Sequence, residues 1–139
     1  ILLGAVISQG QNAIDKSAVL QKIIDLPELQ QYYPKNADGS LKQLYITQHL
    51  VAFPADLAVS KSGSQVLFLT HEEITAKKAE AYFTFRSFGM DQNAANSSLN
   101  FFYDYDYGAG QFKMLTINLE LHKTGEAWNV SSLNIGGDK

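Results

Sequence analysis

The sequence contains no cysteine, which excludes catalytic thiols, thiolate-bound metals and disulfide bonds. Positive charge is also scarce: there are ten lysines and a single arginine, Arg86, with Lys77 and Lys78 as the only adjacent basic pair. Proteins that bind nucleic acids need clustered lysine and arginine to neutralise phosphates, so we expect no nucleic-acid partner. No apolar run approaches the roughly 20 residues that cross a bilayer, so we expect no membrane span.

What the chain does contain is typical of one globular domain. Its 139 residues suit one domain rather than two, and a hydrophobic fraction of 45% can supply a core without metals or disulfides. Aromatic residues make up 12% of the chain, and most of them follow residue 80, where they favour β-strands. No repeat or linker interrupts the sequence, so residues 11–139 are expected to form a single domain.

The first ten residues resemble the end of a signal peptide. Ile1–Ile7 is apolar, and the small residues Ser8 and Gly10, two apart, suit cleavage after Gly10. This pattern predicts an exported protein, periplasmic or extracellular, with residues 1–10 as a signal-peptide remnant. The alternative is that Ile1–Ile7 forms a buried first element, which leaves a cytoplasmic location open.

A helical segment is predicted over Asn12–Tyr33, where apolar residues recur at a spacing near 3.6. Pro27 cannot continue the helical hydrogen-bond ladder, so the helix should break near Asp25 and Leu26. A second short helix, Pro27–Tyr32, then begins with proline at its first position.

The rest of the chain is predicted to be strands. Leu44–Leu50 and Val66–Thr70 are short apolar candidates, and His71 with the two glutamates after it is expected at a strand end. Four longer segments alternate apolar and polar residues: Glu80–Phe88, Leu99–Tyr107, Phe112–Lys123 and Ala127–Ile135. Gly89–Ser97 reads as a loop. Helices followed by sequential strands predict an α+β fold, with an N-terminal helical segment packed on a curved antiparallel β-meander of five to six strands.

The C-terminal hairpin carries a resemblance to a known family. The pattern Leu119-x-Leu121-x-Lys123-x-Gly125-x-x-Trp128-x-Val130, ending at Ile135, resembles the closing hairpin of nuclear-transport-factor-like, cystatin-like domains. The resemblance implies helices packed against a strongly curved sheet. Members of the family include small-molecule-binding proteins, isomerases, dehydratases and exported proteins of unknown role, so the resemblance implies a fold and no particular activity.

Ionisable residues gather on the polar side of the predicted sheet. Strand alternation places them opposite the apolar residues of their own strands; they are Arg86, Asp104, Asp106, Glu120 and His122. One interpretation is a pocket in which Arg86 orients an anionic ligand and His122 exchanges a proton with a carboxylate. The other is a solvated sheet face with weak charge pairs.

Tyrosines mark the opposite side of one strand. Tyr103, Tyr105 and Tyr107 follow Phe101 at a spacing of two, and they either line an aromatic ligand cavity or form a core face. Tyr103 and Tyr105 are therefore kept as ligand-binding candidates.

Metal and cofactor motifs are incomplete in this sequence. Asp104 and Asp106 begin a calcium-like pattern, but Leu115 stands where the loop needs its twelfth-position Glu. His71 begins a zinc-protease-like pattern that has Thr75 in place of the second histidine, and Gly108 and Gly110 lack the third glycine of a dinucleotide site. We expect no metal and no cofactor.

These observations favour a non-enzymatic exported domain that binds a small ligand or another envelope protein through the curved sheet. One alternative is a small cystatin-like enzyme, an isomerase or hydrolase, that uses Asp104 or Asp106 with His122. Another is an interaction module that pairs through an exposed edge strand. The oligomeric state is left open, with a homodimer among the alternatives.

Overall fold

The computed structural model describes residues 15–54, 57–90 and 95–137. An N-terminal helix covers residues 15–24, and the elements after it are η1 (Pro27–Tyr32), β1 (Tyr45–Thr47), β2 (Ser60–Lys61), β3 (Ser64–Gln65), β4 (Leu67–Leu69), α2 (His71–Ala76), β5 (Ala81–Met90), β6 (Asn96–Gly108), β7 (Gln111–Thr124) and β8 (Ala127–Gly137). The predicted break before Pro27 is confirmed. The signal-peptide prediction for residues 1–10 lies outside the described residues.

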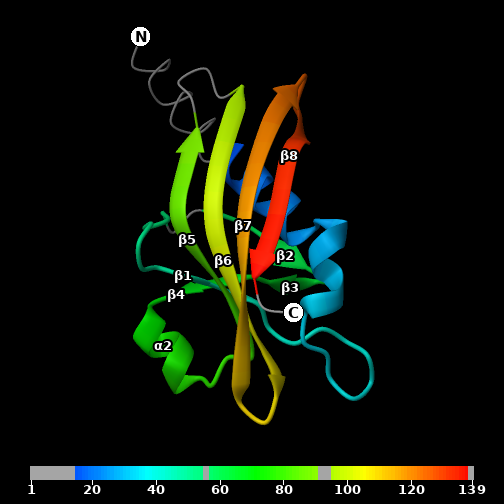
Figure 1. Ribbon diagram of the computed structural model, residues 1–139, viewed down its shortest axis with the longest axis vertical. Helices are drawn as coiled ribbons and strands as arrows, with labels where there is room; N and C mark the ends of the chain where they lie inside the picture. Colours follow the sequence, from blue (N-terminus) through cyan, green and yellow to red (C-terminus); the bar gives the residue numbers. More distant parts are fainter. Residues whose placement is uncertain (1–14, 55–56, 91–94, 138–139) are drawn as a thin grey trace.

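Six strands form one sheet in the order β4-β1-β5-β6-β7-β8 (Figure 1). Strands β5 to β8 make the predicted antiparallel meander. However, β1 pairs in parallel with both β4 and β5, so the sheet is mixed. Parallel strands need crossover connections, whereas a tight hairpin gives only antiparallel strands; here the segment with β2 and β3 connects β1 to β4, and the segment with α2 connects β4 to β5.

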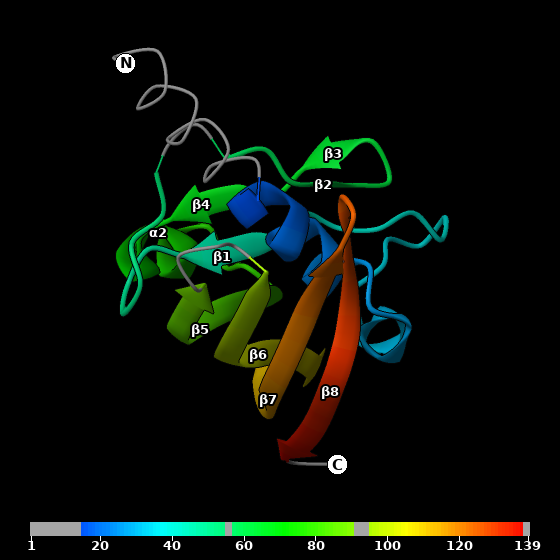
Figure 2. The same cartoon turned by 90° about the horizontal axis from the view of Figure 1, so that it is seen from above.

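The helical segment covers one face of the sheet, which we call the inner face (Figure 2). Side chains buried on both sides of this contact form the core; they include Leu20, Ile23, Leu29, Phe83, Phe101 and Ile117. Lys123 of β7 bonds Asp15 of the first helix across 2.8 Å, and Tyr33 donates to the carbonyl of Ile24 at 2.8 Å. The predicted packing of the helical segment on the sheet is therefore present.

One expected strand end is a helix instead. The hydroxyl of Thr70 accepts a hydrogen bond from the backbone N–H of Glu73, and the Glu73 carboxylate accepts one from the backbone N–H of Thr70. This reciprocal capping satisfies two free donors at a helix start, so it begins α2 at His71. Ile74 is buried on the sheet side of α2. The prediction that His71 and its neighbours end a strand is wrong.

Three register shifts interrupt the meander. The first makes Arg86 of β5 an extra residue, the second makes Tyr107 an extra residue at the end of β6, and the third makes Ser131 of β8 an extra residue opposite β7. Bulges bend and twist the strands that carry them, in agreement with the expected curvature. The loop predicted for Gly89–Ser97 is shorter than expected, because β5 continues to Met90 and β6 begins at Asn96.

Candidate functional site

A groove of about 480 Å³ lies between α2 and the outer face of the sheet, on the side away from the core. The helix and the turn after it contribute His71, Ile74, Thr75 and Lys78. The strands contribute Tyr82 from β5, Asp106 from β6 and Phe112 from β7. The walls are mainly apolar, and this volume falls in the range typical of small-ligand sites, roughly 300–1,000 Å³.

Strand register places the sheet residues of the groove. Tyr82 lies opposite Asp104, and Asp106 lies opposite Phe112, so these four side chains share the outer face. The rings of Tyr82 and Phe112 are 6.2 Å apart between centroids. The imidazole of His71, the first residue of α2, meets the Tyr82 ring edge-on at 6.2 Å.

Asp104 has an unusual electrostatic environment. Partial burial raises the pKa of its carboxyl group, and the nearby His71 partly opposes that rise. Within the described residues, no hydrogen bond or ion pair reaches the Asp104 carboxylate. The pKa of Tyr82 is raised as well, by burial and by the negative charge of Asp104. The groove is thus bordered by a half-buried anion that a donor group could stabilise.

The other polar candidates lie elsewhere on the outer face. His122 is opposite Asn96, and its Nδ1 lies 2.8 Å from the Asn96 Oδ1. Asp104 is eight residues further along β6 than Asn96, which corresponds to about 26 Å of strand. The structure therefore does not bring His122 together with Asp104 or Asp106. Glu120 lies near His122, at the same end of the sheet.

Arg86 is exposed at its bulge, with its guanidinium carbon 5.9 Å from the centroid of the Phe102 ring. It lies four residues beyond Tyr82 on β5, about 13 Å along the strand. Arg86 therefore stands between the two ends of the outer face and lines neither the groove nor the surroundings of His122.

The two tyrosine candidates belong to the core. Tyr103 is fully buried and donates a hydrogen bond to the carbonyl of Tyr32 at 2.8 Å. Tyr105 stacks on Tyr103 with centroids 5.8 Å apart and also packs against the ring of Tyr32. Burial strongly raises the pKa of Tyr103. The structure therefore places both rings in packing contacts.

His71, Lys78, Tyr82 and Phe112 were missed as site residues. The sequence did contain one usable signal, because Thr70-x-x-Glu73 is the pattern of a helix start. A helix there would have placed His71 beside the sheet. His49, which follows β1, lies 6.2 Å from His71 between ring centroids, because the ends of the parallel strands β1 and β4 meet. In the part of the chain that the structure describes, no three metal-ligating side chains come together.

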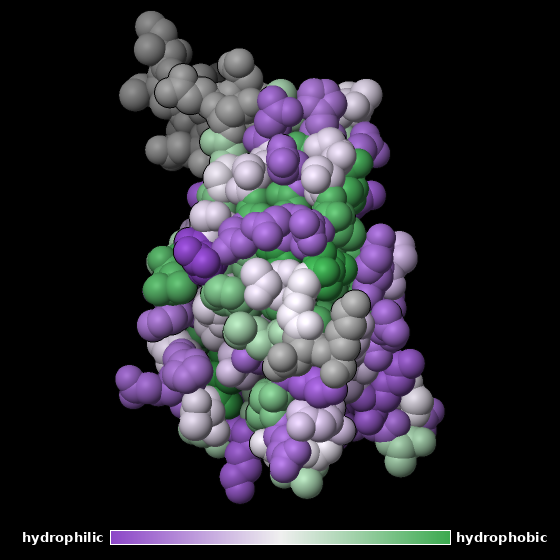
Figure 3. Space-filling model, viewed as in Figure 1, coloured by the Kyte–Doolittle hydropathy of each residue, from purple (hydrophilic) through white to green (hydrophobic). Residues whose placement is uncertain are grey.

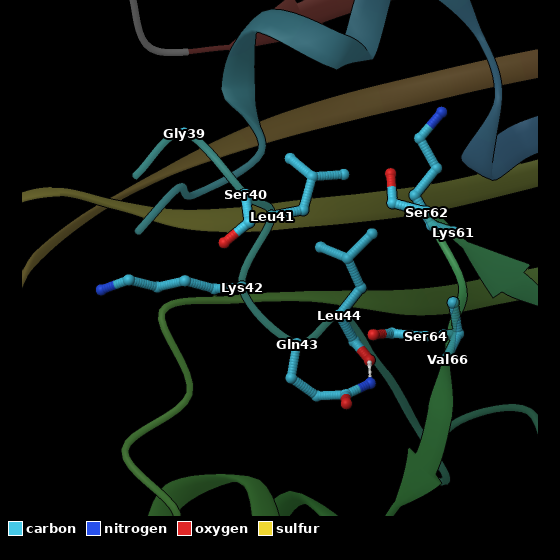
Figure 4. Close-up of a pocket in the computed structure, with 10 residues that line it drawn as sticks. All are labelled: Gly39, Ser40, Leu41, Lys42, Gln43, Leu44, Lys61, Ser62, Ser64 and Val66. Carbon is cyan, nitrogen blue, oxygen red and sulfur yellow. Dashed lines mark hydrogen bonds between the residues drawn. The ribbon is translucent and has the colours of Figure 1, made fainter. Parts of the chain in front are cut away.

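A second cavity of about 310 Å³ lies between residues 39–44 and the β2–β3 hairpin (Figure 4). Its charged groups already have partners, because Lys42 pairs with Glu80 and Lys61 with Asp25. The Gln43 amide donates to backbone carbonyls, including that of Leu44 at 2.9 Å, the bond drawn in Figure 4. These satisfied groups make it a weaker candidate than the α2 groove.

No protein-family model, no curated protein and no solved structure matches this chain. No helix in the described ranges is long and apolar enough to cross a membrane.

Proposed function

We propose that this domain binds a small organic ligand in the groove between α2 and the outer face of the sheet. The observation that carries the proposal is the combination, in one concave site, of apolar walls with a few ionisable groups. Ile74, Tyr82 and Phe112 supply apolar contact area, whereas His71 and Asp106 supply polar contacts. Such a division is typical of sites in which apolar surface gives affinity and polar groups give orientation.

The chemistry of the groove favours a flat, mainly apolar ligand that carries a cation or a hydrogen-bond donor. Aromatic rings attract cations over their faces, and Tyr82 and Phe112 present two such rings. Asp104 and Asp106 add negative charge on the same floor. An aromatic amine would satisfy both features.

We also propose that the fold is cystatin-like and that the protein is exported. The closing hairpin from Leu119 to Ile135 and a helical segment on a curved sheet support the first proposal. The apolar Ile1–Ile7 segment followed by small residues supports the second. An envelope or extracellular site would give such a domain access to ligands outside the cell.

An enzyme that pairs His122 with Asp104 or Asp106 receives less support from the geometry. General acid–base catalysis needs its groups within hydrogen-bond reach, or one water apart, of the same substrate atom. About 26 Å of strand separates His122 from Asp104.

NMR titration of the 15N-labelled protein with a set of aromatic amines tests ligand binding. We expect saturable shifts in α2 and at the adjoining parts of β5, β6 and β7. Thr75→Trp, from the exposed side of α2, should fill the groove and abolish the shifts, whereas Ala76→Trp, which does not line it, should leave them unchanged. Shifts that cluster around the cavity of Figure 4, or that persist in Thr75→Trp, would contradict the proposal.

A further inference from the structure

Strand β8 leaves one of its edges unpaired in the described sheet. It is the last strand in the sheet order and runs for 11 residues, Ala127–Gly137. Proteins usually protect such edges with charged residues, proline or very short strands. The opposite edge strand, β4, has only three residues. β8 contains no charged residue and no proline, so its length and composition leave this edge open to pairing.

Apolar side chains accompany this open edge. Val130 is 40% exposed, and Leu133 and Ile135 are half-buried where they pack on the core. A groove of about 340 Å³ runs between β8 and the start of η1, lined by Val130, Leu133, Leu26 and Pro27 among others. Figure 2 shows η1 beside β8, and Figure 3 shows hydrophobic surface beside the position of β8 in Figure 1. A strand added at this edge would cover these side chains.

The bulge at Ser131 determines the register in which β8 can pair with a copy of itself. Before the bulge Trp128 and Val130 face the core side, and after it Leu133 and Ile135 do, because the extra residue shifts the alternation by one. Residues opposite one another in an antiparallel pair must point to the same face. Because of the shift, the two halves of β8 match faces with a copy only when the paired residue numbers sum to an odd number, so the bulge selects the register.

We propose that a second copy of this chain pairs antiparallel with β8 and extends the sheet across a two-fold axis. In the matching register Val130 lies opposite the partner's Leu133 and Trp128 opposite the partner's Ile135. The same register places Asn129 opposite the partner's Asn134 on the outer face. The axis passes between Ser131 and Ser132, and the interface is isologous, as two-fold symmetry requires.

Charge supports a second copy as the occupant. The strand itself carries no charge, so two copies meet without repulsion along their whole length. The groove beside it is lined by Lys22 as well as by Asp25 and Glu28, so each copy brings both signs of charge to the seam. The proposal is independent of ligand binding at α2, which lies at the far side of the sheet from β8.

Light scattering coupled to size-exclusion chromatography provides the first test. Over a roughly hundredfold rise in concentration, the mass should increase from 15.4 kDa toward twice that value, since dimer formation follows mass action. Asn129→Lys with Asn134→Lys should give a monomer, and so should Asn129→Glu with Asn134→Glu. Mixing the two variants should restore a dimer, because each lysine then faces a glutamate.

The control carries the same added charge away from the edge: Ser98→Lys with Gln111→Lys, on β6 and β7, should dimerise like the unsubstituted protein. A protein that stays monomeric at every concentration overturns the proposal. So does a dimer that the edge charges leave intact, because it would use another surface.

Spin labels test the register without weakening the edge by charge. The chain has no native cysteine, so single cysteines at Ser132 or Ser98 can be labelled cleanly. These residues lie in one row across the sheet, since Ser98 is opposite Glu120 and Glu120 is opposite Ser132. In each copy, Ser98 lies two strand spacings farther from the dimer axis than Ser132. The distance between the two labels of the dimer should therefore be about 19 Å longer for labels at Ser98 than for labels at Ser132. Equal distances, or a shorter one for Ser98, contradict pairing through β8.

Discussion

Tyr82 and Asp104 lie directly opposite each other on β5 and β6, and the negative charge of Asp104 adds to the effect of burial in raising the pKa of Tyr82. Cross-strand neighbours on one face have their Cβ atoms about 5 Å apart, so a charge on Asp104 acts on the phenol at short range. This pair borders the α2 groove, where His71 completes a cluster of three titratable side chains from three elements.

Replacing the carboxylate tests its environment. The pKa of Asp104 is raised in the folded protein, so folding favours its protonated form. Its contribution to stability is present below the unfolded pKa and is lost as the pH rises through the folded pKa. Urea unfolding from pH 3 to 8 should show that the free energy of unfolding of the unsubstituted protein falls through this effect as the pH rises. The Asp104→Asn variant should lack this part of the pH dependence. We expect Asp104→Asn to be more stable at pH 7 by on the order of 0.5 kcal/mol, since solvent screens a half-buried group.

The ionisation of Tyr82 should follow the charge of Asp104. Burial raises the pKa of Tyr82 and the negative charge of Asp104 raises it further, so Asp104→Asn should remove the second effect and lower that pKa part of the way toward the ordinary value for tyrosine. Ultraviolet titration, with Tyr82→Phe to assign the signal, measures the change. An unchanged Tyr82 titration in Asp104→Asn would show that the two side chains do not interact.

The capping interaction at Thr70 should stabilise α2, which forms one wall of the groove. Thr70→Ala removes the side-chain acceptor for the Glu73 N–H and should cost about 1 kcal/mol. Hydrogen exchange in α2 and urea unfolding measure this loss. Thr75→Ala, which removes an exposed hydroxyl from the same helix, serves as the control and should change stability by less than about 0.5 kcal/mol.

Tyr103 should act as a core residue and not as a ligand contact. Tyr103→Phe loses the hydrogen bond to the Tyr32 carbonyl and leaves that acceptor buried, at a cost of about 1 kcal/mol. Tyr107→Phe, at an exposed position, should cost less than about 0.5 kcal/mol. Neither substitution should alter binding of aromatic amines, and weaker binding in Tyr103→Phe would contradict this assignment.

The ion pair between Lys123 and Asp15 joins β7 to the first helix. Asp15 is buried, so Lys123→Met removes the charge that compensates a carboxylate in the interior. We expect a loss of about 3 kcal/mol in the free energy of unfolding. Lys113→Met, on the same strand near the opposite end of β7, should have a much smaller effect in the same unfolding experiment.

Patterning along the chain predicted most of the meander and the proline break. Alternation is read from each strand alone, so Phe83, Phe101 and Ile117 could be assigned to one face before their partners were known. The ring of Pro27 prevents the helical hydrogen-bond ladder from continuing, and this effect also depends only on the local sequence. These features need no knowledge of distant contacts.

The candidate site depended on long-range relationships that local patterns do not contain. His71 meets Tyr82 only because α2 crosses from β4 to β5 over the outer face, and β1 inserts between those two strands. Similarly, alternation placed Asp104 and His122 on one face but could not give their distance along it. That distance is set by the register of β6 against β7, which the turn at Ala109 fixes.

The six-residue length of α2 has a consequence for access to the groove. A helix of this size does not persist by itself in water, so its position depends on the burial of Ile74 and on the cap at Thr70. The sheet floor, in contrast, is held by the long ladders of β5, β6 and β7. We therefore expect the helical wall to unfold locally more readily than the floor, and a ligand bound between them to stabilise α2 against this opening.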